Sequence, residues 1–486
     1  MLLGIDIGTQ SLKAAVTDLA FNVQGQGRRY YHATFPQAGW AEQDPRLWEN
    51  AVGPAIADAL RQADVAATSV EAMGICGQLD GCMAVGSDGE PRGDCIVWMD
   101  RRAEAEMQAI PADLIHTKTG LVVDPSHMAA KISWLKRHSS KTNAAARYHQ
   151  PVSYMVERLT GEAVIDHALA STTMLYNLNE GRFDPDLLAL FDIAADELPR
   201  IAEAGDCVGT LNQHGSEITG LAMGTPVAVG TGDDFSTPLG AGVTRPGEVT
   251  VSIGTGEVVG GLTAAVIVDC GHLVETHAYP AGGYFVENPG WLSGGAVTWL
   301  KGLLGICSFE EFDALAATSP PGAEGILFLP ALTGATAPEW IAGARACFYG
   351  LTAAHGARHL ARAVLEGASF AMRDVIERLV KLGISPTRLM LLSGGSRSRL
   401  AAQIRADVSG RSVALHKYAD TSTIGAAMLA GVAAGTFKTV AEAASCAPTP
   451  AETLDPIPSA SAVLDDSYWR YRELFQSLKP VFNAKG

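Results

Sequence analysis

The stretch Leu2–Asp18 constrains the fold of this chain more than any other part of it. It reads LLGIDIGTQSLKAAVTD, with apolar runs at Leu2–Ile5 and Ala14–Val16 on either side of a polar turn. Short apolar runs that flank a glycine-containing turn are typical of two strands joined by a tight loop. We therefore expect a β-hairpin here, at the start of a buried sheet in an α/β protein.

The turn of this hairpin carries groups that suit a phosphate. Gly8 permits a positive φ and lets a ligand approach the backbone closely. The turn amides, the hydroxyls of Thr9 and Ser11 beside Gln10, and the Lys13 ammonium would all reach one small region. Backbone N–H groups and one cation together make a cradle for an anion. The turn therefore predicts a phosphate site.

Asp6 is placed at the end of the first strand of the hairpin. A carboxylate there is costly unless something compensates its charge. Proteins usually hold Mg²⁺ through waters and one or two carboxylates, so a magnesium ion would account for Asp6. The alternative is an ordinary hairpin in which Asp6 accepts hydrogen bonds from the turn amides.

A second copy of the hairpin favours the phosphate interpretation. Thr250–Leu262 reads TVSIGTGEVVGGL, and its Ile253-Gly254-Thr255-Gly256 repeats Ile7-Gly8-Thr9-Gln10 between apolar runs. Internal repeats point to repeated structural units. Two such hairpins, one on each half of the chain, could hold a polyphosphate from both sides. The P-loop pattern GxxxxGK[ST] does not occur in the sequence.

Length and composition exclude several classes of protein. A chain of 486 residues with 47% hydrophobic residues has room for two or three domains and is not disordered. A formal net charge of −16 argues against a nucleic-acid partner. No run of 18 apolar residues predicts a membrane span, and the eight cysteines are scattered without a CxxC pair. We expect a cytoplasmic protein that binds no nucleic acid and no membrane.

Polar groups follow two further predicted strands. Ala72–Cys76 leads into Gly77-Gln78-Leu79-Asp80-Gly81, and Cys95–Trp98 leads into Met99-Asp100-Arg101-Arg102. Ligands usually bind where consecutive strands of an α/β sheet end. The sequence therefore predicts a substrate cluster, with a surface salt bridge between Asp100 and an arginine as the alternative; its candidate members are Gln78, Leu79, Asp80, Trp98, Asp100 and Arg102.

A third strand, Val227–Val229, leads through glycines into Asp233 and Asp234. A carboxylate after a glycine turn at a strand end suits a general base that reaches into a cleft. The alternative is an aspartate that caps a following helix, and with two aspartates both interpretations can hold.

Three other stretches predict ligand contacts or an insertion in the fold. Gly294-Gly295 precedes a helix start that could place amides near an anion. Gly394-Gly395 follows the strand Leu389–Leu392 and would let a planar base lie against the backbone, and the small-residue helix Thr423–Ala434 could pack beneath that loop. Residues 181–220 are polar and look like an irregular insertion.

Taken in order, these motifs resemble the FGGY carbohydrate kinases, and within that family most of all the xylulokinases. The order and spacing of the motifs across about 430 residues make the resemblance specific, although each motif alone is weak. They are Asp6-Ile7-Gly8-Thr9-Gln10-Ser11-x-Lys13, Trp98-Met99-Asp100-Arg101-Arg102, Leu159-Thr160-Gly161-Glu162, Gly230-x-Gly232-Asp233, Ser252-Ile253-Gly254-Thr255, Gly350-Leu351-Thr352, Leu365-Glu366-Gly367, and Gly394-Gly395 with Ala406-Asp407 downstream.

The resemblance implies two actin-like, ribonuclease-H-like domains around a central cleft, here residues 1–243 and 244–486. It implies a kinase that uses ATP and Mg²⁺, with Asp233 as the base and Asp6 organising the metal. The sugar would lie in the first domain and contact the substrate cluster together with Asp233 and Asp234. ATP would lie mostly against the second, and its contacts would be Thr9, Gln10, Ser11, Lys13, Gly254, Thr255, Gly295, Gly394 and Gly395.

The sequence departs from the family pattern at two places, of which the first bears on the substrate and the second on any role of that stretch in domain closure. Leu79-Asp80 stands where xylulokinases carry Met-His and glycerol kinases carry Arg-Glu, and Gly334-Ala335-Thr336-Ala337-Pro338 stands where GERTP is usual. Asp80 can accept bonds from two hydroxyls and would repel a carboxylated sugar such as gluconate. The first choice of substrate is D-xylulose; D-ribulose, L-xylulose, glycerol and tetritols are the alternatives.

Two other classes of function compete with a sugar kinase. One is a sugar-binding regulator that has lost phosphoryl transfer, against which Asp6, Lys13 and Asp233 argue. The other is a chaperone-like or actin-like ATPase, which would have no use for the substrate cluster. A homodimer is common among such kinases.

Overall fold

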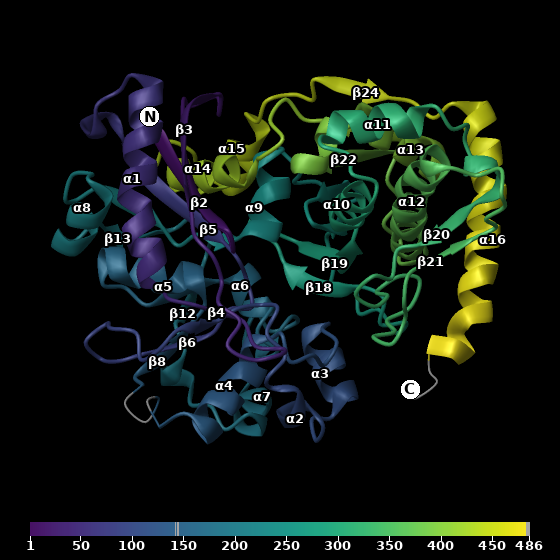
Figure 1. Ribbon diagram of the computed structural model, residues 1–486. Helices are drawn as coiled ribbons and strands as arrows, with labels where there is room; N and C mark the ends of the chain where they lie inside the picture. The colour runs from purple at the N-terminus through teal and green to yellow at the C-terminus, as the bar shows by residue number, and fades with distance from the viewer. Residues whose placement is uncertain (141, 143–144, 483–486) are drawn as a thin grey trace.

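The predicted hairpin forms strands β1 and β2 of the first of two large mixed sheets in the computed structural model, which describes residues 1–140, 142 and 145–482 (Figure 1). The sheet runs in the order β13-β14-β5-β1-β2-β3, with β15 paired to β5. β1 lies antiparallel to β2 and parallel to β5. Its strands are β1 (Leu2–Ile7), β2 (Ser11–Thr17), β3 (Val23–Tyr30), β5 (Ala72–Gly77), β13 (Cys207–Thr210), β14 (Pro226–Ala228) and β15 (Thr231–Gly232).

The second large sheet repeats the start of the first. Its hairpin β16–β17 is antiparallel, and β16 lies parallel to β22, as β1 lies parallel to β5. The order is β18-β19-β17-β16-β22-β23-β24. The strands are β16 (Val249–Ile253), β17 (Gly256–Thr263), β18 (Glu275–Ala278), β19 (Tyr284–Leu292), β22 (Arg388–Leu392), β23 (Ser412–Leu415) and β24 (Glu452–Leu454).

Helix α14 (Ser422–Ala433) connects the two halves. It belongs to the second half of the sequence but packs on β1 and β5 of the first sheet, where Figure 1 also draws it. Gly4 on β1 permits this close contact, because a Cβ at that position would lie 1.8 Å from the Thr423 carbonyl oxygen. The packing of this helix beneath the Gly394 loop stays a prediction. The division at residues 243 and 244 stays a prediction.

The other helices cover the sheets and the outer edges of the two halves, with α16 running along the side of the second half that lies away from the first (Figure 1). They are α1 (Arg46–Ala63), α2 (Glu104–Met107), α3 (Ala112–Thr119), α4 (Met128–His138), α5 (Pro151–Thr160), α6 (His167–Ser171), α7 (Pro185–Leu190), α8 (Gln213–Thr219), α9 (Asp233–Gly240), α10 (Gly294–Leu303), α11 (Phe309–Ala317), α12 (Ala357–Lys381), α13 (Arg399–Ser409), α15 (Val440–Ser445) and α16 (Pro458–Phe482).

Residues 181–220 are not the irregular insertion that their polarity predicted. They contain α7, α8 and strand β13, which joins the first sheet beside β14. Short elements on a sheet edge bury few side chains, so their sequence keeps a polar, loop-like composition. The remaining strands form small pairs: β4 (Glu42–Gln43) with β7 (Cys95–Ile96), β6 (Met83–Val85) with β8 (Arg147–His149), β9 (Val164–Asp166) with β12 (Arg200–Ala202), β10 (Tyr176–Asn177) with β11 (Arg182–Phe183), and β20 (Leu327–Leu329) with β21 (Cys347–Tyr349).

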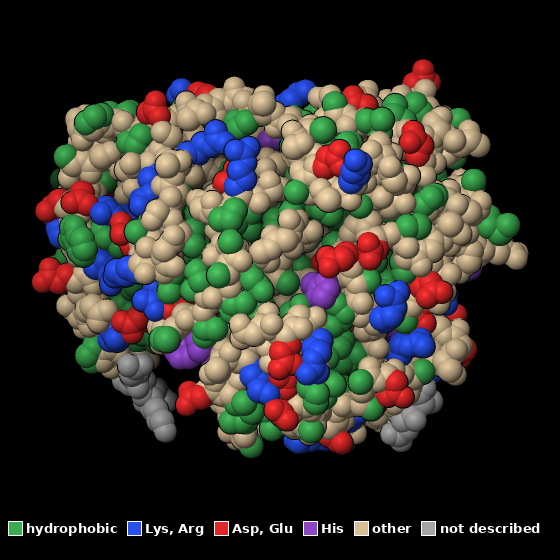
Figure 2. All heavy atoms as spheres, turned by 180° about the vertical axis from the view of Figure 1, so that it is seen from behind, with side chains coloured by type: hydrophobic (Ala, Val, Ile, Leu, Met, Phe, Trp, Pro, Cys, Tyr) green, Lys and Arg blue, Asp and Glu red, His purple; other side chains and the backbone are tan. Residues whose placement is uncertain are grey.

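The surface mixes charges of both signs. On the face turned away from the viewer of Figure 1, basic and acidic side chains are interspersed (Figure 2). Within the described residues, no helix is both long enough and apolar enough to cross a bilayer.

Candidate functional site

Three parallel strands end at one edge of the first sheet and bring the predicted residues together there. β1 pairs with β5 so that Asp6 lies beside Cys76, and β15 pairs with β5 so that Gly232 lies beside Gly77. Gln78 and Asp233 are the residues that follow these last two positions. The structure thus places the phosphate hairpin, the substrate loop and the candidate base side by side, as expected for ligand groups at strand ends.

Asp6 is buried and only half satisfied. Its Oδ2 accepts from Lys13 Nζ at 2.9 Å and from the Ser422 hydroxyl at 2.7 Å, whereas Oδ1 has no partner among the described residues. The alternative in which Asp6 bonds to turn amides is not what the structure shows. A buried carboxylate oxygen without a partner suits a water-mediated magnesium ion, which completes its shell with waters and substrate phosphates. The described residues hold no cluster of three or more metal-ligating side chains.

Lys13 joins Asp6 to a second carboxylate. Its Nζ lies 2.9 Å from Asp6 Oδ2 and 2.7 Å from Asp420 Oδ2. Burial alone would lower the pKa of the Lys13 ammonium, but the two carboxylates outweigh it and the pKa is raised. Lys13 is therefore a cation at any physiological pH, as the predicted phosphate site requires.

The turn of the first hairpin is tied to the predicted substrate loop. The Thr9 hydroxyl donates to Gln78 Oε1 at 3.3 Å and accepts from the Trp98 indole at 3.0 Å. Gln78 donates in turn to Gln43 at 2.7 Å. Gly8 is not in the positive-φ region, so that reason for a glycine is wrong; a Cβ there would lie 3.1 Å from the Ser11 carbonyl oxygen.

Asp100 and Arg102 form a salt bridge, as the alternative to a substrate role predicted, but the pair is buried and not on the surface. Arg102 Nε lies 2.9 and 3.0 Å from the two Asp100 oxygens, its Nη2 2.7 Å from Oδ2, and its Nη1 2.7 Å from Glu42. The guanidinium also stacks 3.8 Å from the Trp40 ring centroid. The strand before them, β7, pairs with β4 and not with the first large sheet, so the expectation of consecutive strand ends is wrong for these two residues. Strands of two residues bury too little to be located from apolar pattern.

Asp233 and Asp234 are the first two residues of α9, and Gly232 is the N-cap. Neither aspartate is therefore the cap that the alternative required. Burial, followed by repulsion from Asp234 and Asp6, raises the pKa of Asp233 well above its usual value, with Lys13 opposing. Burial and then Asp80 raise the pKa of Asp234 to about 6. A carboxylate with a raised pKa is a stronger base, which suits proton abstraction near neutral pH.

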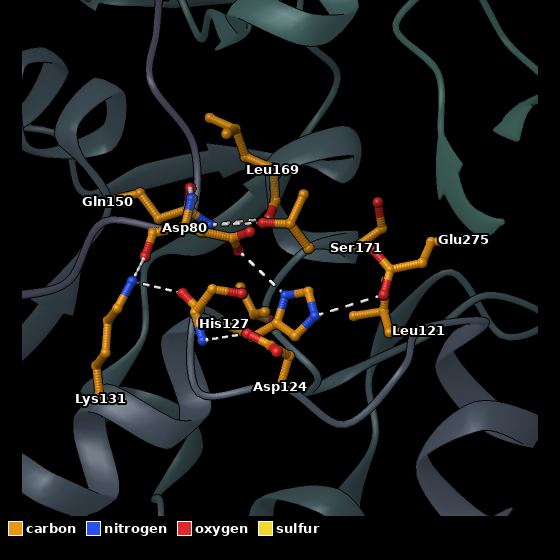
Figure 3. A network of polar contacts seen from close by, with 12 residues as sticks. Asp80, Leu121, Asp124, His127, Lys131, Gln150, Leu169, Ser171 and Glu275 are labelled. Atoms are coloured by element: carbon orange, nitrogen blue, oxygen red, sulfur yellow. Dashed lines mark hydrogen bonds and ion pairs between the residues drawn. The ribbon is translucent and has the colours of Figure 1, made fainter. Parts of the chain in front are cut away.

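Three buried side chains contact Asp80 (Figure 3). Its N–H donates to Gln150 Oε1 at 3.0 Å, its carbonyl accepts from Lys131, and its Oδ1 lies 3.4 Å from His127 Nδ1. Its φ is +59°, a left-handed conformation that is uncommon for residues other than glycine. The Leu79 side chain packs beside the start of α9, because a Cβ on Gly232 would lie 3.2 Å from Leu79 Cδ2.

The sequence-based predictions missed three side chains of the second half that interact with this region. Glu275 on β18 lies opposite Glu287 on β19, and His277 Nε2 is 3.5 Å from Glu287 Oε1. All three are buried, and Glu287 Oε2 and His277 Nδ1 have no partner among the described residues. Burial and then Asp234 and Glu275 raise the pKa of Glu287, while burial lowers the pKa of His277 to about 4. Like charges directly opposite each other on paired strands cost stability. The pairing of Glu275 with Glu287 is therefore the feature that could have identified these residues as candidate site residues.

The glycines predicted to contact ATP from the second half differ in how much space surrounds them. The Thr255 carbonyl accepts from the Gly295 N–H at 2.9 Å, so that amide is already engaged. Gly254 is open, and so is Gly394, where a Cβ would have no neighbour within 4 Å. A Cβ on Gly395 would lie 2.3 Å from Ile253 Cγ2, so this glycine is required by packing against the end of β16.

A cavity of about 750 Å³ lies between the two halves beside Lys13. Lys13 and Arg28 line it from the first half, and Ser396 and Arg397, which directly follow Gly394-Gly395, line it from the second. Its volume is in the range of small-molecule sites. Thr9, Gly254 and Thr255 do not line it.

Comparisons with known proteins agree with the geometry. Residues 1–240 match the model described as the N-terminal domain of the FGGY family of carbohydrate kinases, and residues 249–434 match its C-terminal domain. Glycerol kinases of Aromatoleum aromaticum and Gloeobacter violaceus are each 34% identical, over 91% and 92% of this chain and 92% and 91% of theirs. A solved xylulose kinase of Rhodospirillum rubrum is 29% identical, with a TM-score of 0.89 over 99% of this chain and 100% of that one.

Proposed function

The chain belongs to the FGGY family of carbohydrate kinases, as its motifs predicted, and we propose that it phosphorylates a primary hydroxyl of a small uncharged ketose or polyol, with D-xylulose as the first candidate. The two-domain fold and ATP-dependent sugar or polyol phosphorylation are those of the family. What remains to be assigned is the acceptor and the role of each residue.

The observation that carries the proposal is the charge of the region around Asp80, Asp233 and Asp234. Ionised carboxylates only accept hydrogen bonds, so they suit the O–H groups of a polyhydroxyl compound. Among the described residues, the cations that interact with these groups are already engaged: Lys13 pairs with Asp6 and Asp420, Lys131 donates to backbone carbonyls, and His127 lies between Asp80 and Glu275. A carboxylated or phosphorylated acceptor would meet repulsion without a free cation to offset it.

The number of carboxyl groups at the site favours a substrate with more hydroxyls than glycerol. Once Asp233 takes the reacting hydroxyl, the carboxyl groups of Asp80, Asp234 and Glu287 remain nearby to form hydrogen bonds with the other hydroxyls. Glycerol keeps only two hydroxyls for them, whereas a ketopentose or a tetritol keeps more. Glycerol is the second candidate, because the curated relatives at 34% identity are glycerol kinases.

In the proposed reaction the first hairpin and the second hairpin hold the phosphates of ATP from opposite sides. Lys13 neutralises negative charge, Thr9, Gln10 and Ser11 orient the turn, and Gly254 and Thr255 contribute from the second half. Gly394 lies where adenine could rest against the backbone, with Gly395 fixing that turn on β16. Phosphoryl transfer depends mainly on such alignment and charge neutralisation.

Asp233 accepts the proton of the attacking primary hydroxyl. An alcohol is a weak acid, so the proton moves late, when the oxygen already bonds to phosphorus. Mg²⁺ held through water by Asp6 would add positive charge at the transferring phosphoryl group. Trp98 and Gln78 hydrogen-bond to the Thr9 hydroxyl and so fix the position of the β1–β2 turn relative to the loop that begins at Gln78.

The test is ADP release from MgATP by the purified protein with D-xylulose, D-ribulose, L-xylulose, erythritol, threitol, glycerol and gluconate. The expected result is release that requires a neutral acceptor, is greatest with a ketopentose or tetritol, and is absent with gluconate. Equal ADP release with no acceptor would indicate an ATPase and contradict the proposal. Activity with gluconate above that with every neutral acceptor would contradict the assigned class of substrate.

A further inference from the structure

His127 links Asp80, in the loop that follows β5 of the first half, to β18 of the second sheet (Figure 3). It is the N-cap residue of α4 and is buried. Its Nδ1 lies 3.4 Å from Asp80 Oδ1, and its Nε2 lies 3.7 Å from Glu275 Oε1 on β18. Glu275 Oε1 also accepts the N–H of Val122, at 2.8 Å, from the first half. One imidazole therefore stands between carboxylates that come from different halves of the protein.

On the premise of the proposed function, we propose that His127 is a positioning residue of the acceptor site: it fixes the Asp80 carboxylate for the acceptor's secondary hydroxyls and ties it to Glu275 across the two halves. Acceptor affinity then depends on a contact that exists only when both halves are in place.

The backbone of Asp80 supports this role. Its left-handed conformation is strained for an aspartate and persists only because neighbouring groups hold it. Lys131, which is fully buried, uses its ammonium on the carbonyl oxygens of Asp80 and Ser126. Gln150 holds the Asp80 N–H. Since the main chain is fixed on both sides, only the carboxylate remains to be oriented, and His127 is the side chain that does so.

The charge of His127 follows from its neighbours. Burial would lower the pKa of its imidazole, but Asp80 and Glu275 outweigh burial and raise it well above the usual value. The other charged or titratable groups in contact or electrostatic interaction with this network are Asp124, Lys131, His277, Asp234 and Glu287. At neutral pH His127 is a cation between two carboxylates, hydrogen-bonded to Asp80 and ion-paired with Glu275. A charge-assisted hydrogen bond is about twice as strong as a neutral one.

The test compares His127→Gln with wild type, after wild type has been shown to phosphorylate a neutral acceptor. Glutamine keeps a hydrogen-bond donor but removes the charge. We expect the KM for the acceptor to rise roughly tenfold or more, with kcat and the KM for ATP within about threefold. His138→Gln, at the exposed far end of the same helix, is the control and should leave all three constants unchanged.

Two further measurements separate positioning from a general structural effect. His127 is charged below its raised pKa, so its contribution to acceptor binding is present at neutral pH and is lost as the pH rises through that pKa. The wild-type KM for the acceptor should therefore rise at alkaline pH. In His127→Gln this alkaline rise in KM should be absent. Glu275→Gln keeps the acceptor for Val122 and should raise the same KM less than additively with His127→Gln.

The outcomes distinguish the two proposals. If wild type is an acceptor-dependent kinase and His127→Gln matches it in acceptor KM and pH profile, the positioning role is refuted while the proposed function stands. Should His127→Gln fail to fold, Glu275→Gln alone decides: an unchanged acceptor KM refutes the link across the halves, and a raised KM with unchanged kcat supports it. A wild type with no acceptor-dependent activity refutes the proposed function itself.

Discussion

The Ser422 hydroxyl donates to Asp6 Oδ2 over 2.7 Å, although 416 positions separate the two residues in the chain. Ser422 is the first residue of α14, the helix of the second half that packs on the first sheet. The contact therefore fixes the candidate magnesium-organising carboxylate by means of the same helix that joins the halves.

Ser422→Ala should weaken both the fold and the metal site. A hydrogen bond to a charged group contributes about 1.5–3 kcal/mol, so the free energy of unfolding in denaturant should fall by about that amount. The Mg²⁺ concentration that gives half-maximal kinase activity should rise, because Asp6 loses one of its two orienting partners. Ser477→Ala, on the exposed face of α16, is the matched control. Unchanged unfolding and unchanged Mg²⁺ dependence would show that the contact is incidental.

The two glycines of the turn after β22 should respond differently to alanine. A Cβ on Gly394 meets open space, so Gly394→Ala should fold normally but raise the KM for ATP, because the methyl group would occupy the surface proposed for adenine. A Cβ on Gly395 would lie 2.3 Å from Ile253, so Gly395→Ala should destabilise the protein by about 1–3 kcal/mol. Thermal unfolding and ATP kinetics of both variants check this. A normal KM for ATP in Gly394→Ala would remove adenine from that turn.

Asp234→Asn should move the pH dependence of the reaction. The base must be ionised, so kcat/KM for the acceptor falls on the acid side with the pKa of free Asp233. Asp234 is one of the groups that raise this pKa, after burial. Its neutralisation should therefore lower the pKa of Asp233 and move the acid limb to lower pH. A limb that stays in place or moves to higher pH would contradict the assignment of Asp233 as the base.

The parts of the site that the sequence predicts are those that local pattern determines. Asp6 lies near the end of the buried strand β1, Gln78 directly follows β5 and Asp233 directly follows β15, and strand ends of a parallel sheet meet at one edge. The repeat of the first hairpin at Ile253–Gly256 predicted the symmetry of the two sheets in the same way.

The parts that the sequence does not predict depend on contacts between distant segments. His127 and Glu275 lie at a helix cap and on an edge strand, where a charged residue ordinarily faces solvent, yet both are buried and lie close to each other in the structure. Asp100 and Arg102 show the opposite case, because a motif near the site proved to contain a buried ion pair stacked on Trp40. Whether a charged residue in a motif binds ligand or a neighbour depends on tertiary packing that spacing does not encode.

The most direct test of the account is the turnover of Asp233→Asn with the best neutral acceptor, measured beside acceptor binding by calorimetry. If Asp233 takes the proton of the acceptor hydroxyl, kcat falls roughly 10²–10⁴-fold while the dissociation constant of the acceptor changes less than about threefold. A kcat within about threefold of wild type would contradict it.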